Sequence, residues 1–186
     1  ELRAFDEEIA WNYEIGAKTQ FLDRKLTLNA AVFYIDWTDI QVNSQVLVSG
    51  RPVGYTANAN TADSLGFEVE LTAEPSDYLT FYGGLSYSPI RIKDYVDSRV
   101  SRAGITTDGS DQLGNTPDWT GNVGFEYRRP VSDDWEIFWQ SDASYNSTMY
   151  ASVANLAETG AKTIVDMFVG VSNENLEFTL FANNLF

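Results

Sequence analysis

A small basic cluster is the first group of residues whose chemistry could serve binding. Arg91, Lys93, Arg99 and Arg102 lie close together in a stretch that is otherwise rich in Gly, Ser, Thr and Asp. Guanidinium and ammonium groups donate charge-assisted hydrogen bonds to carboxylates and phosphates. The cluster could therefore contact an anionic ligand, such as a metal chelate, or the phosphates of a lipid surface. A scattered set of solvated loop charges is the alternative interpretation.

Carboxylates form a second group, on positions that alternate with apolar residues. A pair of such groups could act as general acid and base in glycoside hydrolysis. The simpler interpretation is a solvated polar wall with cross-strand pairs to Lys18 or Arg128. Nothing in the sequence indicates a separate cleft, so the wall is favoured. The carboxylates are Glu14, Glu68, Glu70, Glu126, Glu136, Asp142 and Glu177.

The composition excludes several other chemistries. The chain has no histidine and no cysteine, so it lacks the usual zinc and haem ligands and the base of a Ser-His triad. Residues 108–111, Asp-Gly-Ser-Asp, resemble part of a calcium loop but lack its further ligands. A net charge of −15 opposes binding to nucleic acid. The sequence predicts no catalytic residue, no metal and no cofactor.

The elements that position these groups follow a period of two. In residues 9–21 the odd positions are mostly apolar and the even positions mostly polar, as in a strand with two unlike faces. Tyr13 is therefore predicted to face lipid and Glu14 to face a lumen. Comparable segments predict eight strands, at about 9–21, 25–37, 64–74, 77–89, 118–129, 134–146, 162–172 and 175–184.

The connections between these strands alternate strictly in length. Short turns rich in Asp, Asn, Ser and Pro alternate with long irregular stretches at about 38–63, 90–117 and 147–161. In an up-and-down meander, all short turns lie at one end and all long loops at the other. Outer-membrane barrels have this asymmetry, with short periplasmic turns and long extracellular loops. We therefore expect the three long loops outside the cell.

Strand length and aromatic content also indicate a membrane barrel. The predicted strands run about 10–13 residues, near the 9–11 that a tilted transmembrane strand needs. Aromatic residues reach 14%, and barrels gather them in two interfacial girdles. We expect the tryptophans in such girdles rather than in a sugar-stacking platform, and we expect three apolar side chains to face inward. These are Trp11, Trp37, Trp119, Trp135 and Trp139 for the girdles, and Phe33, Phe138 and Met167 inward.

Several runs of residues resemble a known family. Residues 13–18 followed by 26–42, then 58–59 leading into 66–71, and the closing 182–186 are similar to TonB-dependent outer-membrane receptors. The resemblance covers nearly the whole chain in the family's order. It implies an all-β fold: an antiparallel, up-and-down transmembrane β-barrel segment, about eight strands of a larger barrel of about 22 with a plugged lumen.

The resemblance also implies a function and partners. Residues 1–186 would be part of a barrel, with the plug domain and the final strand absent. The barrel would lie in the outer membrane, in contact with lipid and lipopolysaccharide, and take up a scarce nutrient such as a ferric siderophore. Energy would come from the TonB complex through the missing N-terminal region. Two alternatives stay open: a secreted soluble β-sandwich that binds carbohydrate, and a complete small eight-stranded barrel.

Overall fold

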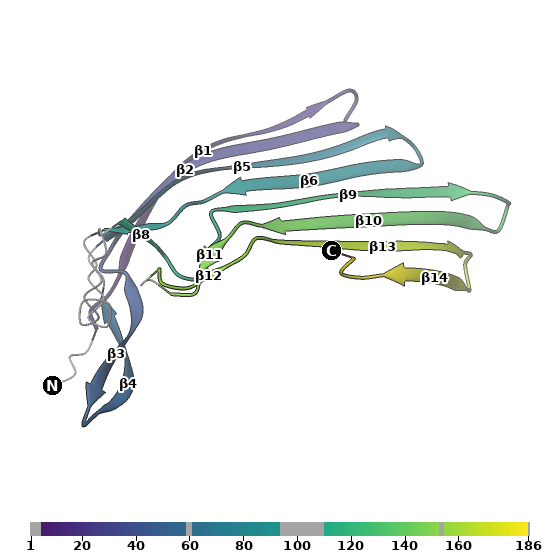
Figure 1. Cartoon of the computed structure of the whole chain (residues 1–186). Coiled ribbons are helices and arrows are strands. Elements are labelled where there is room, and N and C mark those ends of the chain that lie inside the picture. The colour runs from purple at the N-terminus through teal and green to yellow at the C-terminus, as the bar shows by residue number, and fades with distance from the viewer. Residues whose placement is uncertain (1–4, 59–60, 94–109, 153–154, 186) are drawn as a thin grey trace.

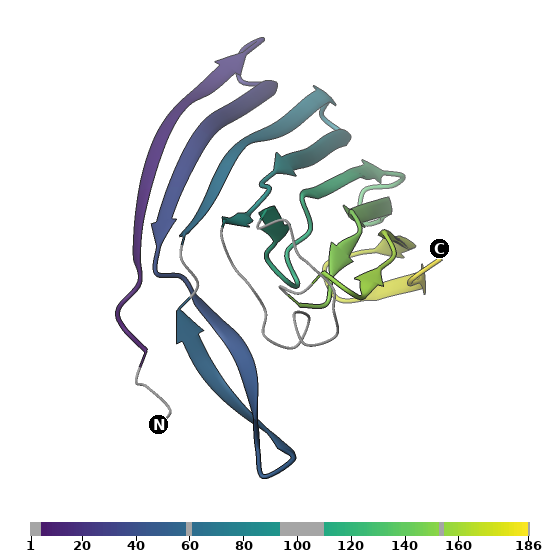
Figure 2. The ribbon, with the colours of Figure 1, turned by 60° about the vertical axis from the view of Figure 1, so that its left-hand side comes forward.

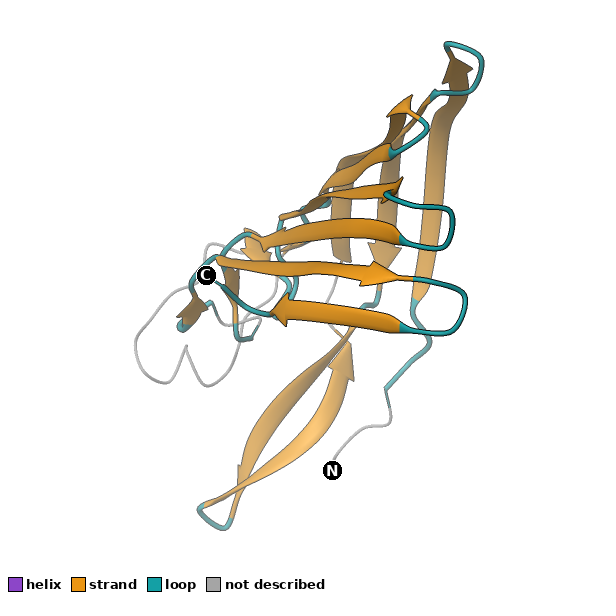
Figure 3. Cartoon of the chain, turned by 90° about the vertical axis from the view of Figure 1, so that its right-hand side faces the viewer, coloured by secondary structure: helices purple, strands orange, loops and turns teal. Residues whose placement is uncertain are grey.

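The chain consists of strands joined by turns and loops. The computed structural model describes residues 5–58, 61–93, 110–152 and 155–185, and Figure 3 shows strands as its only regular element. Among these residues, no helix has the length and hydrophobicity that a membrane crossing requires. The strands are β1 (Ile9–Phe21), β2 (Leu26–Thr38), β3 (Gln41–Val48), β4 (Arg51–Asn58), β5 (Thr61–Ser76), β6 (Leu79–Tyr87), β7 (Arg91–Lys93), β8 (Ser110–Gln112), β9 (Trp119–Pro130), β10 (Glu136–Asn146), β11 (Met149–Tyr150), β12 (Glu158–Thr159), β13 (Lys162–Ser172) and β14 (Glu177–Ala182).

Eight of these strands form one antiparallel meander. Their order is β1-β2-β5-β6-β9-β10-β13-β14, with each strand beside the next of the eight in the chain. They match the eight predicted strands, although their ends differ by a few residues. Figures 1 and 2 show the sheet as a curved single layer. In the described part of the chain β1 and β14 do not pair, so this sheet is an open arc rather than a closed small barrel.

The pairing register gives the sheet two chemically different faces. Tyr13 pairs with Tyr34 on the apolar face, and Glu14 pairs with Phe33 on the polar face. The opposite faces predicted for Tyr13 and Glu14 are therefore confirmed, and Phe33 lies on the polar face as expected. The prediction for Met167 was wrong, because Met167 pairs with Ser141 in a row of the apolar face. Its strand carries apolar residues on both faces, so alternation did not fix which set points inward.

The short turns are stabilised by local hydrogen bonds. In the turn between β13 and β14, the Asn173 side-chain oxygen accepts from the backbone N–H groups of Asn175 at 2.9 Å and Leu176 at 2.8 Å. This is the side-chain mimicry of a backbone turn that favours Asn at such positions. Figure 1 shows all four short turns at one end of the sheet, here called the turn end. The long connections leave from the opposite, loop end.

The long connections are less irregular than the sequence suggested. Residues 41–58 form the hairpin β3–β4, a separate two-stranded sheet that extends beyond the loop end. Its turn has Ser49 at φ 51° and Gly50 at φ 79°, the pair of positive angles that a tight two-residue hairpin turn requires. The next connection contains β7 and β8, which extend the main sheet at β5, and the third contains the short pair β11–β12.

Candidate functional site

The loop end of the sheet holds a small hydrophobic core. Ile40 and Val42 at the base of the β3–β4 hairpin pack with Ala62 of β5 and Ile92 of β7, and all four are at most 4% exposed. Trp37, Ile90 and Leu113 pack against them. The core joins the first and second long connections to the main sheet. It also corrects the prediction for Trp37, which packs here and does not belong to an interfacial girdle.

The base of the β3–β4 hairpin is also held by the segment before β1. The Asn58 side chain donates to the backbone carbonyls of Asp6 at 3.1 Å and Asp39 at 2.6 Å, and accepts from the Asp6 N–H at 2.8 Å. The Gln41 N–H donates to the Glu8 carboxylate at 2.8 Å. These bonds fix the position where the hairpin leaves the sheet.

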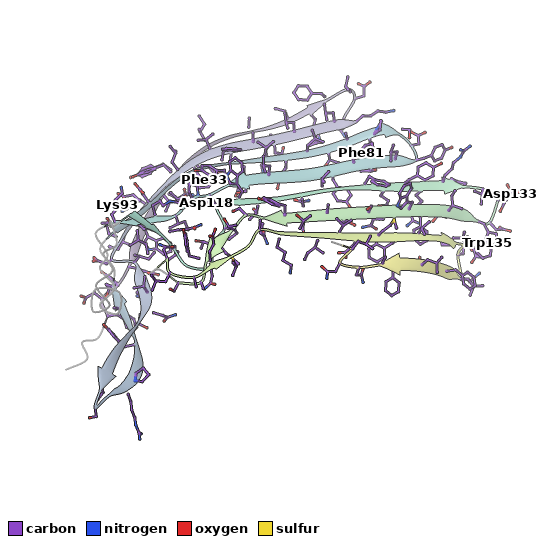
Figure 4. The ribbon with its side chains drawn as sticks, viewed as in Figure 1. Phe33, Phe81, Lys93, Asp118, Asp133 and Trp135 are labelled. Carbon is purple, nitrogen blue, oxygen red and sulfur yellow. The ribbon has the colours of Figure 1, made fainter. Side chains whose placement is uncertain are left out.

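Two members of the basic cluster pair with carboxylates of this protein. Arg91 forms a two-pronged ion pair with Asp118, with Nη1 donating to Oδ1 at 2.8 Å, and Lys93 pairs with Asp63. These hydrogen bonds raise the pKa of Arg91 and of Lys93. Both residues thus hold the base of the second connection. Arg99 and Arg102, and positions 108 and 109 of the calcium-like segment, lie outside the described residues. Figure 4 shows Lys93 and Asp118 at the loop end.

The second and third long connections contact each other directly. The Asn115 N–H donates to the Tyr150 carbonyl at 2.7 Å, and the Asn155 side chain donates to the Gln112 carbonyl at 3.3 Å. Gly114 lies so close to Ser152 that a Cβ on it would be 2.6 Å from the Ser152 Cα. Together with the core, these contacts join the described parts of residues 39–60, 88–118 and 147–161 into one structure, here called the loop rim.

Adding a methyl group at Gly114 is expected to separate two connections of the loop rim. Gly114→Ala places a Cβ against the Ser152 backbone, which cannot rotate away, and such overpacking costs about 1–3 kcal/mol. Limited proteolysis should then cut residues 147–161 faster than in the parent protein. Gly160→Ala is the matched control, because a Cβ there meets nothing within 4 Å. Equal cleavage rates in the two variants would contradict the contact.

The polar face carries the predicted carboxylates and is hollowed beside them. One hollow of about 540 Å³ lies over β1, β2 and β5, and a second of about 270 Å³ lies over β5, β6 and β9. Glu68 and Glu70 line both hollows, and Asn29 donates to Glu70 at 3.4 Å. All seven carboxylates lie on this face by register, as expected. The hollows are open to the surface rather than enclosed clefts.

Further along the polar face, Arg128 of β9 forms one ion pair within its strand and one with the next strand, β10. Arg128 pairs with Glu126 at 3.1 Å and with Glu136, and its guanidinium carbon lies 5.1 Å from the centre of the Phe138 ring. The predicted pairing to Arg128 is therefore confirmed. The predicted pairing to Lys18 was wrong, since no carboxylate of the described residues lies within ion-pair distance of Lys18.

Three inward-facing aromatic residues each lie opposite a glycine. The register pairs are Phe33 with Gly66, Phe138 with Gly170, and Tyr82 with Gly124. The Tyr82 hydroxyl crosses Gly124 and donates to Asp142 on the following strand. Because glycine has no side chain, each of these glycines leaves space for the opposite ring. The rings therefore lie against the sheet. This explains how Phe33 and Phe138 are only 9% and 7% exposed on a polar face.

Aromatic residues of the apolar face meet in two groups. Toward the loop end, the Tyr87 and Trp119 rings lie 4.5 Å apart, centre to centre, with Phe67 beside them. Nearer the middle of β9 and β10, the Phe125 and Trp139 rings lie 4.9 Å apart, centre to centre. The group at the loop end suits a margin that lies at a membrane–water interface. Trp11 is on the apolar face and 63% exposed.

The arrangement suits passage and capture rather than bond-breaking chemistry. In the described part of the chain, no three His, Cys, Asp or Glu side chains gather in a way that could hold a metal ion. The polar wall offers open hollows and paired charges, and the described part of the loop rim offers a platform at one end. The charges identified from sequence at positions 91 and 93 stabilise this platform. The contact between the second and third connections could not be read from the sequence.

Comparison with known proteins identifies the family. The barrel model described as "TonB dependent receptor-like, beta-barrel" matches residues 3–185. The chain is 28% identical over 185 residues to the probable TonB-dependent siderophore receptor PiuA of Acinetobacter baumannii, covering 97% of this chain and 23% of PiuA. It is 27% identical over 187 residues to the catecholate siderophore receptor Fiu of Escherichia coli, covering 98% and 22%.

Solved structures agree with these relatives. The crystal structure of PiuA matches with a TM-score of 0.70 and 25% identity, over 95% of this chain and 24% of that protein. The closed form of Fiu matches with a TM-score of 0.69, over 97% and 24%. The chain thus spans about a quarter of the length of each relative. In such a barrel wall, the apolar face meets lipid and the polar face lines the lumen. The chain belongs to the TonB-dependent receptors, a family of outer-membrane transporters rather than enzymes, and it forms part of their β-barrel wall.

Proposed function

We propose that this chain is a section of the barrel wall of a receptor that takes up a ferric siderophore with energy from TonB. The observation that carries the proposal is the ordered loop rim at one end of a membrane wall. A rim held by a core, ion pairs and cross-connection bonds can present side chains to a ligand in a fixed arrangement. The two relatives that are siderophore receptors by name support the choice of ligand class.

The proposal includes the rest of the receptor. A sheet of eight strands would be one arc of a larger cylinder, and the plug domain, the segment that contacts TonB and the final strand would belong to other parts of the protein. The loop end would face the outside of the cell, near lipopolysaccharide, and the turn end the periplasm, because family barrels have short periplasmic turns. The hollows of the polar face would then lie along the path of the ligand.

Uptake of radioactive iron tests this function. Cells that carry the complete receptor should accumulate iron presented as a catecholate complex, and deletion of either the receptor or TonB should reduce uptake to background. Arg99→Gln with Arg102→Gln should weaken binding about tenfold or more if these side chains contact an anionic chelate. Arg51→Gln, at the exposed tip of the β3–β4 hairpin, is the control. Undiminished uptake without the receptor would refute the proposal.

A further inference from the structure

The chain changes its pairing register by one residue just after β14. Met167 of β13 pairs with Ala182 of β14, and this register would bring residue 184 opposite Val165. Instead, the Leu185 N–H donates to the Val165 carbonyl at 3.0 Å. The outer strand therefore contains one residue more than its neighbour over this stretch. Such an extra residue in one strand of an antiparallel pair is a β-bulge.

Two residues hold this bulge. Asn184 has a φ of 56°, in the left-handed region that Asn adopts more readily than most residues with a side chain. Its backbone N–H donates to the Asp166 carboxylate at 2.9 Å. Asp166 is the register partner of Asp142, so its side chain stands on the polar face. Asn184 thus supplies the backbone angle of the bulge, and Asp166 supplies the acceptor for the displaced N–H.

The bulge decides which residue of this segment meets lipid. Val165 is the register partner of Ala143, which pairs with Val123 on the apolar face. With the extra residue, Leu185 continues this apolar row, and it is 47% exposed. Without the extra residue, Asn184 would take that place, because a slip of one residue turns every following side chain to the opposite face.

We propose that Asp166 and Asn184 form a register lock, which sets the facing of the chain at the outer edge of this section of the wall. Within the described part of the chain, β14 pairs on one side only, with β13. In the complete barrel a further strand pairs with its other side, because a membrane barrel has no open edge. The lock therefore also sets the register in which that strand can pair. This role depends on the place of the chain in a barrel wall and not on the nutrient that the receptor transports.

A nitroxide label at position 185 tests the facing that the lock sets. The complete receptor, freed of other cysteines, is labelled at one introduced cysteine and placed in lipid bilayers. Paramagnetic resonance then compares collisions with oxygen, which concentrates in lipid, and with a water-soluble nickel chelate. Reference labels at Leu180, on the apolar face, and Thr179, on the polar face, lie before the bulge. We expect the oxygen-to-nickel ratio at 185 to match that at 180. A match with 179 would overturn the proposal.

The carboxylate is tested by a pair of substitutions at register partners. Asp166→Ala removes the acceptor of the Asn184 N–H and should lower the oxygen-to-nickel ratio at 185 to that of the polar face. Asp142→Ala is the matched control, because Asp142 accepts from the side chains of Tyr82 and Gln140 and not from the bulge. The ratio at 185 should not change in this control. Equal ratios in the two variants would overturn the role of Asp166.

A second pair tests the backbone angle and leaves both carboxylates in place. Asn184→Gly suits a positive φ and should keep the ratio at 185, whereas Asn184→Val should lower it, because a β-branched residue is an outlier in the left-handed region. All variants are compared at equal amounts of folded, heat-modifiable receptor. Equal ratios in the Gly and Val variants would overturn the lock. This pair also decides the matter if Asp166→Ala does not fold.

Discussion

Arginine in place of Val123 is expected to destabilise the folded barrel by about 2–4 kcal/mol, the cost of a cation on the lipid face near the bilayer midplane. Val123 is 63% exposed on the apolar face, on a strand near the middle of the sheet. Its register partners on the two sides are Gly83 and Ala143, which offer no charge to compensate the guanidinium. Equilibrium unfolding of the receptor in bilayers, followed by heat-modifiable gel migration, measures the loss.

The matched substitution for this test lies on the other face of the neighbouring strand. Ser144 pairs with Asn122 and follows Ala143, so Ser144→Arg places the same side chain in the hydrated lumen at nearly the same depth. It should cost less than about 1 kcal/mol, as ordinary surface substitutions do. Equal losses for Val123→Arg and Ser144→Arg would mean that the two faces have been assigned to the wrong environments.

A methyl group on Gly66 is expected to destabilise the wall by about 3 kcal/mol, the upper part of the usual range for overpacking. The added Cβ would overlap the Tyr87 carbonyl oxygen and would lie 2.8 Å from Cε2 of the Phe33 ring. The carbonyl belongs to the neighbouring strand and cannot move without breaking the ladder. The same bilayer unfolding measurement applies to Gly66→Ala.

Gly84 gives the control for that substitution. It lies on the same polar face, but the nearest atom to its Cβ position is the flexible Asn122 side-chain oxygen at 3.0 Å. Gly84→Ala should therefore cost much less than Gly66→Ala. If both variants unfold at the same denaturant concentration, the close packing of Phe33 over Gly66 contributes nothing to stability.

Alternation alone was enough to predict the eight long strands and the face of most side chains. Tyr13 is aromatic and Glu14 is charged. Only one phase of the strand alternation puts the ring on the apolar face and the carboxylate on the polar face. The β3–β4 hairpin was missed because its surroundings are rich in polar and small residues. The Ser49-Gly50 pair was the available signal, since this dipeptide suits a turn with two positive φ angles.

The interactions of the candidate site depend on residues far apart in the chain. Arg91 can form its ion pair with Asp118, and Lys93 with Asp63, only after the strands have paired. The local cluster of positive charge therefore suggested ligand binding. In the structure, two of its four residues form ion pairs that hold the second connection in place. The aromatic–glycine pairs were likewise invisible, because which glycine faces which ring follows from the register and not from either strand alone.

The loop rim limits how this protein can change over evolutionary time. In a loop that contacts no other loop, residues can be substituted one at a time. Selection then acts on each substitution only through ligand binding. Here Gly114 contacts the backbone of Ser152, and Ile92 is packed among side chains of the first connection. A replacement in one connection must therefore also suit its neighbours. New ligand specificities would arise through coordinated changes in adjacent loops, or at outward positions such as the tip of the β3–β4 hairpin.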